Sequence, residues 1–217
     1  SKASQVRHSL SYPTFHTIYE NKKLIYFRTG EHRSAWTYQI SADEGKTWKG
    51  PENNVVDLNL GGETQPENNK SGIEEWSSYQ TCLPGKDGKF LHVAFMYYDD
   101  NKKDIPEKYY NPRYQTQTNL NIKYNLYYVK INLQTHEVEN FDGEFLKTPI
   151  DMETANAKCK IWDTDWRGAG VPPDIIIDEN DNPAFLHVLS ENTSKEFNYY
   201  YVRYVNKKWE QTVIAPS

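Results

Sequence analysis

The chain has 217 residues, among them 17 Tyr and 6 Trp, which suits one β-rich protein that binds ligands on its surface. A net charge of -5 and a pI near 5.7 argue against non-specific binding to nucleic acid, which needs a basic face. No apolar run approaches the roughly 18 residues that cross a bilayer, so we expect a soluble protein without a membrane partner. The chain begins Ser-Lys-Ala-Ser without an apolar leader, and we expect that its original N-terminus has been removed.

The first sixty residues contain a strand over 12–18, a polar turn at 20–23 and a second strand over 24–27. A third strand with aromatic alternation is expected over 36–40 and a fourth over 55–58. Between these two lies the stretch 41–48, Ser-Ala-Asp-Glu-Gly-Lys-Thr-Trp. There Asp43 can accept backbone N–H bonds, Gly45 can adopt the positive φ of a tight bend, and Trp48 can enter an apolar layer.

The same layout returns twice. The second unit has strands over 79–83, 90–95 and 124–129 with turns at 86–89 and 132–136, and the third has strands over 173–177, 185–189, 199–204 and 211–214. A fourth strand is expected to close each unit, as at 55–58 and 211–214, and repeated units of four antiparallel strands predict an all-β protein, a β-propeller with blades at about 8–60, 73–150 and 165–217. The chain holds about three to four blades, and three blades do not close a ring that typically has four to eight, so we interpret the chain as part of a larger propeller whose remaining blades are its partner.

Helical periodicity is nearly absent, and residues 151–160 are expected to form a loop or one short turn. The long polar connections 61–77 and 99–123 are of the kind that carries function or moves. Cys82 and Cys159 lie far apart without a C-x-x-C pattern; a disulfide, buried thiols and part of a metal site remain open, and buried thiols are favoured.

Successive turns of an antiparallel blade alternate between the two faces of the disc, so ligands are expected on the face opposite the 41–48 turn. The loops expected there are 28–33, an insert that starts at 97 and 190–196. His92 and His187 fall at the same repeat position as Tyr26 and are interpreted either as satisfied core histidines or as site residues. Arg203 is either a solvated arginine on aromatic surface or a carboxylate clamp.

Other candidates are ambiguous between structure and function. His32 and Arg33 are solvated loop charges or substrate ligands, and Asp163 and Asp165 are turn formers or cation ligands. Four tyrosines of the insert are either sugar platforms or loop anchors: Tyr97, Tyr98, Tyr109 and Tyr110.

The blade pattern resembles the BNR-repeat propeller proteins, and within them the ulvan-lyase-like polysaccharide lyases. The likeness rests on 41–48, which matches the Asp-box S-x-D-x-G-x-T-W, and on the stretches 12–15, 87–93, 124–128, 173–175 and 186–188. The resemblance implies a secreted, seven-bladed enzyme, extracellular or periplasmic, that splits uronate-containing acidic polysaccharides by β-elimination with His, Tyr and Arg.

Carried over by position, the resemblance implies catalytic roles for His92, Tyr124, His187 and Arg203. Arg203, assisted by His92, would neutralise the uronate carboxylate, and His187 or Tyr124 would act as base and acid. The candidate substrate-binding residues are His32, Arg33, Tyr97, Tyr98 and Tyr201.

Two other functions remain open. One is a non-catalytic glycan-binding propeller, because the Asp-box is a structural clip; the other, less favoured, is a sialidase-like glycoside hydrolase, whose early F/Y-R-I-P stretch is replaced here by residues 12–15. No cofactor is required by this chemistry, and a structural Ca²⁺ or Zn²⁺ is left open.

Overall fold

A computed structural model describes residues 10–30, 33–60, 76–100, 110–111, 116–117, 121–164, 171–190 and 197–217. The first sheet is a three-stranded antiparallel meander in the order β1-β2-β3. Its strands are β1 (Ser11–Thr17), β2 (Lys23–Arg28) and β3 (Trp36–Ser41), with a 3-10 turn, η1 (Tyr19–Asn21), between the first two.

The second sheet has six strands, five in the order β10-β9-β8-β5-β4 and a sixth, β11, that pairs with β8. The third sheet has the order β12-β13-β14-β15. The second contains β4 (Trp76–Pro84), β5 (Phe90–Asp100), β8 (Asn121–Asn132), β9 (Val138–Glu139), β10 (Phe145–Leu146) and β11 (Lys160–Trp162). The third contains β12 (Asp174–Ile177), β13 (Pro183–Ser190), β14 (Phe197–Val205) and β15 (Lys208–Pro216), and a separate pair consists of β6 (Tyr110–Asn111) and β7 (Thr116–Gln117).

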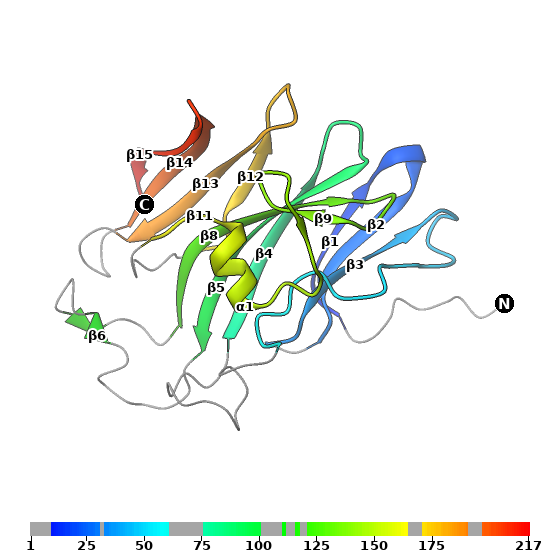
Figure 1. Cartoon of the computed structure of the whole chain (residues 1–217), viewed down its shortest axis with the longest axis horizontal. Helices are drawn as coiled ribbons and strands as arrows, with labels where there is room; N and C mark the ends of the chain where they lie inside the picture. The colour runs from blue at the N-terminus through cyan, green and yellow to red at the C-terminus, as the bar shows by residue number, and fades with distance from the viewer. Residues whose placement is uncertain are drawn as a thin grey trace.

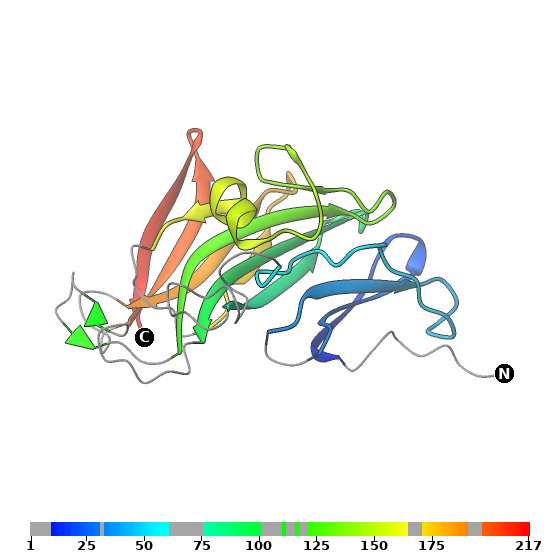
Figure 2. The ribbon, with the colours of Figure 1, turned by 60° about the horizontal axis from the view of Figure 1, so that its bottom comes forward.

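The three sheets stand side by side in chain order, as both views show (Figure 1, Figure 2). The first strand of each sheet is the contact strand: β1 lies against β4, and β4 lies against β12. Antiparallel meanders that meet through their first strands are arranged as neighbouring blades of a propeller. The predicted all-β propeller class is therefore confirmed, whereas the closure of a larger ring by further blades stays a prediction.

Two apolar clusters fill the spaces between the sheets. One joins the first and second sheets through fully buried side chains such as Leu24, Phe95 and Tyr127, and the other joins the second and third through Met96 and Phe185. The strand β5 serves both clusters because alternate side chains point to opposite faces of a sheet. Each blade is thus held mainly by its neighbour.

The 41–48 turn has the predicted geometry. Asp43 Oδ1 accepts the Thr47 N–H at 2.8 Å, its Oδ2 accepts the Thr47 hydroxyl at 2.7 Å, and Gly45 has φ +84°. These bonds lower the pKa of Asp43 to about 2, with the Thr47 hydroxyl as the main cause. Trp48 is only half-buried, and it meets exposed Phe15 edge to face rather than entering the main core.

Two local expectations were wrong. Residues 55–58 form no fourth strand, because single bridges at Trp36–Val56 and Ile40–Lys49 replace a ladder. Residues 152–159 are helical, with α1 (Met152–Thr154) continuing into a π-helical turn (Ala155–Cys159), and the helix starts where the Asp151 carboxylate accepts the Thr154 N–H at 2.8 Å.

Both cysteines are free and buried, which confirms the expectation of buried thiols. Most of the long connections 61–77 and 99–123 lies outside the described residues.

Gly88 joins the first two sheets and gives a test of this contact. Its φ is +68°, its carbonyl accepts the Tyr19 N–H, and a Cβ on it would lie 2.6 Å from Tyr19 N. We expect Gly88→Ala to destabilise the fold by more than the roughly 1–2 kcal/mol of the left-handed conformation alone. Gly143→Ala is the matched control, because Gly143 has φ +80° with nothing within 4 Å of the added Cβ. Equal losses in urea unfolding would show that the Gly88 contact is not tight.

Candidate active site

The turns of the three sheets meet on one face of the molecule, which we call the clip face. It consists of residues 18–22, 42–48, 85–89, 132–137 and 178–182. Backbone bonds join several of these turns, from Tyr19 N to Gly88 O at 3.3 Å and from Leu133 N to Lys89 O at 2.8 Å. In Figure 1 the β1–β2, β4–β5 and β12–β13 turns lie along the upper edge. The opposite face is formed by the other ends of the same strands.

Four polar side chains of the first two sheets gather at that opposite face. They are Tyr12, Arg28, Tyr79 and Lys123, which we call the tyrosine–cation cluster. The Tyr12 and Tyr79 rings meet edge to face at 5.4 Å between centroids. The Arg28 guanidinium lies 4.9 Å from the Tyr12 centroid and 5.9 Å from that of Tyr79, and Lys123 Nζ lies 5.4 Å from the Tyr79 centroid.

Strand ends position the cluster. Arg28 is the last residue of β2 and pairs with Ser11, whose hydroxyl accepts its Nε–H at 3.0 Å. The pairing of β1 with β2 shifts between Ser11 and Thr14, and Tyr12 at this irregularity has φ 52°. A bulge of this kind re-aims a side chain, and Tyr12 is accordingly 55% exposed above the buried Arg28.

The environment changes the proton affinities of two cluster residues. Burial raises the pKa of Tyr79, and its hydrogen bond with Tyr12 adds to this, while Arg28 opposes both effects. Burial lowers the pKa of Lys123. Tyr79 is therefore a proton donor at neutral pH, and the partly desolvated Lys123 gains from an incoming anion.

His92 lies far from this cluster, on the clip-face side. It is the third residue of β5 and fully buried, with Nδ1 2.7 Å from the Tyr128 hydroxyl and Nε2 3.4 Å from Asp181 Oδ2. Asp181 belongs to the β12–β13 turn and also accepts the Lys86 N–H at 3.1 Å. His92 thus links the second blade to the third.

His187 and Arg203 are not brought together with His92. His187 is fully buried, is the fifth residue of β13 and meets Trp162 edge to face at 5.8 Å. Phe90 and Asn182 hold equivalent places in their turns, and His92 lies two residues after the one whereas His187 lies five after the other, so the repeat alignment that equates the two histidines is out by three residues. Arg203 is exposed with its guanidinium 5.8 Å from the half-buried Tyr201, which fits the solvated arginine of the first interpretation.

The other predicted residues lie nearer the face opposite the clips. Tyr97 is buried and pairs with Tyr124, and Tyr98 pairs with Ser77; these pairs fall in the second half of β5, towards its end. The Arg33 carbonyl accepts the Asn59 side chain at 2.7 Å. Three further candidates, His32, Tyr109 and Asp165, lie outside the described residues. The catalytic and binding roles of all these residues stay predictions.

The sequence alone did not identify the tyrosine–cation cluster, although all four of its residues stand at the ends of expected strands or loops. Tyr12 and Tyr79 each stand at the head of the first strand of a unit. Arg28 begins the first of the loops expected at the ligand face, and Lys123 is the last residue of a long connection. Only the strand register brings the four together.

No group of three or more His, Cys, Asp or Glu side chains that would hold a metal ion occurs within the described ranges. In the same part of the chain, none of the helices has the length and apolar character that spanning a bilayer requires.

His92 predicts how stability depends on pH. Burial lowers the pKa of His92 below the value of about 6.5 in an unfolded chain, so the unfolded state binds more protons as pH falls below 6.5. The free energy of unfolding should therefore decrease from pH 7.5 to pH 5.5, and His92→Gln should flatten this decrease. Burial lowers the pKa of His16 and His136 as well, so part of the slope should persist. Urea unfolding at both pH values measures the effect, and an unchanged slope in the variant would contradict it.

The chain belongs to the BNR repeat-containing family, whose model matches residues 2–216. It is 27% identical over 136 residues to an ulvan lyase of Alteromonas sp. (strain LOR), a match that covers 62% of this chain and 24% of that protein. It is 24% identical over 172 residues to an ulvan lyase of Nonlabens ulvanivorans, covering 75% and 31%. The chain thus spans less than a third of either relative.

Among solved structures, the fold is similar to that of a polysaccharide lyase, a PL25 ulvan lyase bound to -[GlcA(1-4)Rha3S]-. The TM-score is 0.74 at 21% identity, and the match covers 93% of this chain and 43% of that one. This likeness agrees with the blade arrangement described above.

Proposed function

We propose that the protein is a polysaccharide lyase that cleaves a uronate-containing acidic polysaccharide by β-elimination. The observation that carries the proposal is the tyrosine–cation cluster, two phenols in contact with two cations on the face opposite the clip turns. Membership of the BNR repeat-containing family and the likeness to ulvan lyases support it.

β-Elimination needs a cation for the uronate carboxylate, a base for the C5 proton and an acid for the leaving oxygen. Lys123 is the cation that pairs with the uronate carboxylate. Burial disfavours its charged ammonium, and an ion pair with the carboxylate offsets that loss. Tyr12, the exposed phenol, takes the C5 proton on its oxygen, and the Arg28 guanidinium against its ring stabilises negative charge there.

The departing glycosidic oxygen needs a proton, which the second phenol supplies. As the C5–H electrons form the C4–C5 double bond, the C4–O bond breaks and Tyr79 donates its proton to the glycosidic oxygen. Proton transfer between the two hydrogen-bonded phenols then returns the pair to its starting state. The products are a new non-reducing end with an unsaturated uronate and an ordinary reducing end.

The proposed location is extracellular or periplasmic, because a polymeric substrate has to meet its enzyme outside the cell's permeability barrier.

A screen of uronate-containing polysaccharides, sulfated and unsulfated, tests the proposal. Lyase activity produces the ultraviolet absorbance of the unsaturated uronate together with shorter chains. Shorter chains with saturated ends would identify a hydrolase instead. Binding without any change in chain length would identify a glycan-binding propeller and overturn the proposal.

A further inference from the structure

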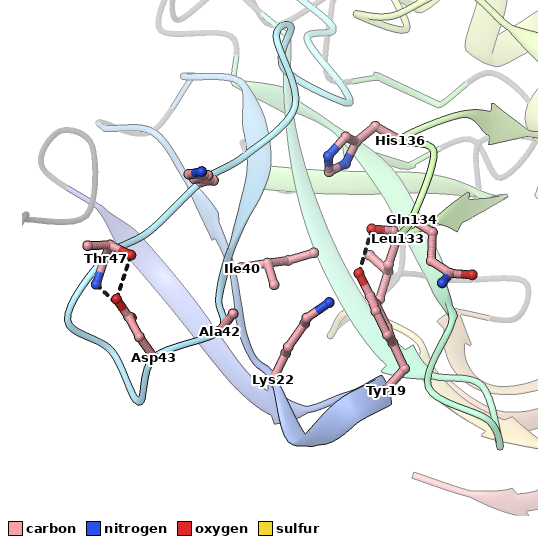
Figure 3. Close-up of a pocket in the computed structure, with 10 residues that line it drawn as sticks. Tyr19, Lys22, Ile40, Ala42, Asp43, Thr47, Leu133, Gln134 and His136 are labelled. Atoms are coloured by element: carbon pink, nitrogen blue, oxygen red, sulfur yellow. Dashed lines mark hydrogen bonds between the residues drawn. The ribbon is translucent and has the colours of Figure 1, made fainter.

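A pocket lies on the clip face, between the first and second blades. Its volume is about 290 Å³, near the lower end of the range for ligand sites. Three turns line it: the β1–β2 turn, the 41–48 turn and the β8–β9 turn (Figure 3). The ten lining residues, which we call the clip-face pocket, are Tyr19, Lys22, Ile40, Ala42, Asp43, Thr47, Lys49, Leu133, Gln134 and His136.

Two lysines line this pocket and offer ammonium donors to a ligand. Lys22 Nζ lies 4.2 Å from the centroid of the Tyr19 ring and 2.6 Å from Glu20 Oε2, contacts that hold the ammonium in place and raise its pKa. The exposed Glu20 carboxylate does not take all three N–H groups of the ammonium, so donors remain for a ligand. Lys49, an exposed lysine, is the second cation of the lining.

The acidic residue of the pocket keeps its negative charge, because its hydrogen bonds lower the pKa of Asp43 to about 2, but its oxygens point into its own turn. Asp43 directs Oδ1 to Thr47 N and to the Ser41 hydroxyl, both at 2.8 Å, and Oδ2 to the Thr47 hydroxyl at 2.7 Å. Its carboxylate is therefore occupied inside its own turn, as the dashed bonds to Thr47 in Figure 3 show.

Neutral donors and an apolar wall complete the pocket. His136 Nδ1 lies 2.6 Å from the hydroxyl of the buried Tyr38, whose raised pKa keeps it protonated, so the phenol donates and His136 carries its own proton on Nε2. The Gln134 amide adds two more N–H groups at the rim. Ile40, Ala42 and Leu133 supply apolar surface that suits the C–H groups of a sugar ring.

The walls are formed before any ligand arrives. Ile40 and Lys49 exchange two backbone hydrogen bonds at 2.7 and 2.9 Å, and the Asn132 side chain accepts the N–H groups of Gln134 and Thr135. A site with a fixed backbone loses little ordering entropy on binding.

We propose that the clip-face pocket binds a sugar unit of an acidic glycan through its carboxylate or sulfate group, on the face away from the tyrosine–cation cluster. This inference rests on the proposed function for the identity of the glycan. Two cations spaced around a pocket of this size fit one anionic group on one ring. The site would retain a long substrate on the protein between cleavages.

Backbone amide shifts in NMR test the inference, with three probes: an unsulfated uronate tetrasaccharide, a sulfated oligosaccharide without uronate, and the uronate tetrasaccharide with its carboxyls reduced. At low salt, shifts are expected at 42–49 and 133–136 with at least one of the two anionic probes. Which of the two causes them identifies the carboxylate or the sulfate. Shifts there with the reduced sugar alone, or with none of the probes, would overturn the inference.

Single substitutions separate the pocket from general surface charge. Lys22→Ala and Lys49→Ala should each weaken binding at the pocket roughly five- to tenfold, the loss of one charge-assisted hydrogen bond. Lys46→Ala is the matched control, because Lys46 lies in the same turn, carries the same charge and does not line the pocket. An equal effect of Lys46→Ala would overturn the inference.

Activity distinguishes this inference from the proposed function. Pocket variants should leave cleavage of a short oligosaccharide unchanged and raise KM for the long polymer. If the amide signals of the pocket shift with the anionic probes but the protein cleaves no polysaccharide, the pocket binds glycan and the lyase assignment is wrong. If the protein cleaves and no pocket shift appears, the pocket assignment alone is wrong.

Discussion

Tyr79→Phe is expected to lower kcat for polysaccharide cleavage by about 10²–10⁴-fold, the usual contribution of a positioned general acid. The variant keeps the ring that meets Tyr12 edge to face and removes only the hydroxyl that donates to the glycosidic oxygen. KM should change little, because the proton is needed in the transition state rather than for binding. Initial rates of unsaturated uronate formation measure both constants.

The control for Tyr79→Phe removes a phenol elsewhere. Tyr204→Phe acts on a partly exposed tyrosine of β14, packed on Phe141 at 4.5 Å near the clip face, and should leave kcat unchanged. Loss of the hydrogen bond to Tyr12 should cost Tyr79→Phe only about 1 kcal/mol of stability, so a folded variant is expected. A tenfold or smaller effect on kcat would remove Tyr79 from the mechanism.

Local sequence signals were sufficient for the repeat and its turns. The strands at 90–95 and 124–129 follow directly from apolar and aromatic runs, and Asp43 and Gly45 adopt the roles that their chemistry requires. Such features depend on residues close in the chain. The missing fourth strand at 55–58 differs because its pairing with β3 depends on distant geometry, and only the bridge at Trp36–Val56 forms.

The site was harder to predict because register, not residue type, decides it. A histidine in an apolar strand looks the same whether it lies at the ligand face or the clip face, and three residues of register separate the position of His92 from that of His187. In contrast, Tyr12 and Arg28 reach one another because β1 has a shifted pairing next to its first residue. No periodicity in a single sequence reports a bulge.

Phe95→Ala is expected to destabilise the protein by about 3–5 kcal/mol, the usual cost of emptying a buried phenylalanine site. Phe95 is fully buried in the cluster between the first two blades and stacks on Tyr127 at 5.0 Å between centroids with 15° between the planes. In the β4–β5 ladder, the pair next to Phe95 is Tyr79 and Met96, and this Tyr79 is the one in the tyrosine–cation cluster. The same cavity should therefore lower activity by loosening the strand that positions Tyr79.

Phe145→Ala is the matched control, since Phe145 is 66% exposed on β10 and should cost less than about 0.5 kcal/mol. Urea unfolding of both variants measures the difference, and the activity of Phe95→Ala is assayed where the variant is still folded. A loss below about 1 kcal/mol for Phe95→Ala would mean that the two blades do not pack through this face. Because the tyrosine–cation cluster takes Tyr12 and Arg28 from the first blade and Tyr79 and Lys123 from the second, the catalytic assignment requires that packing.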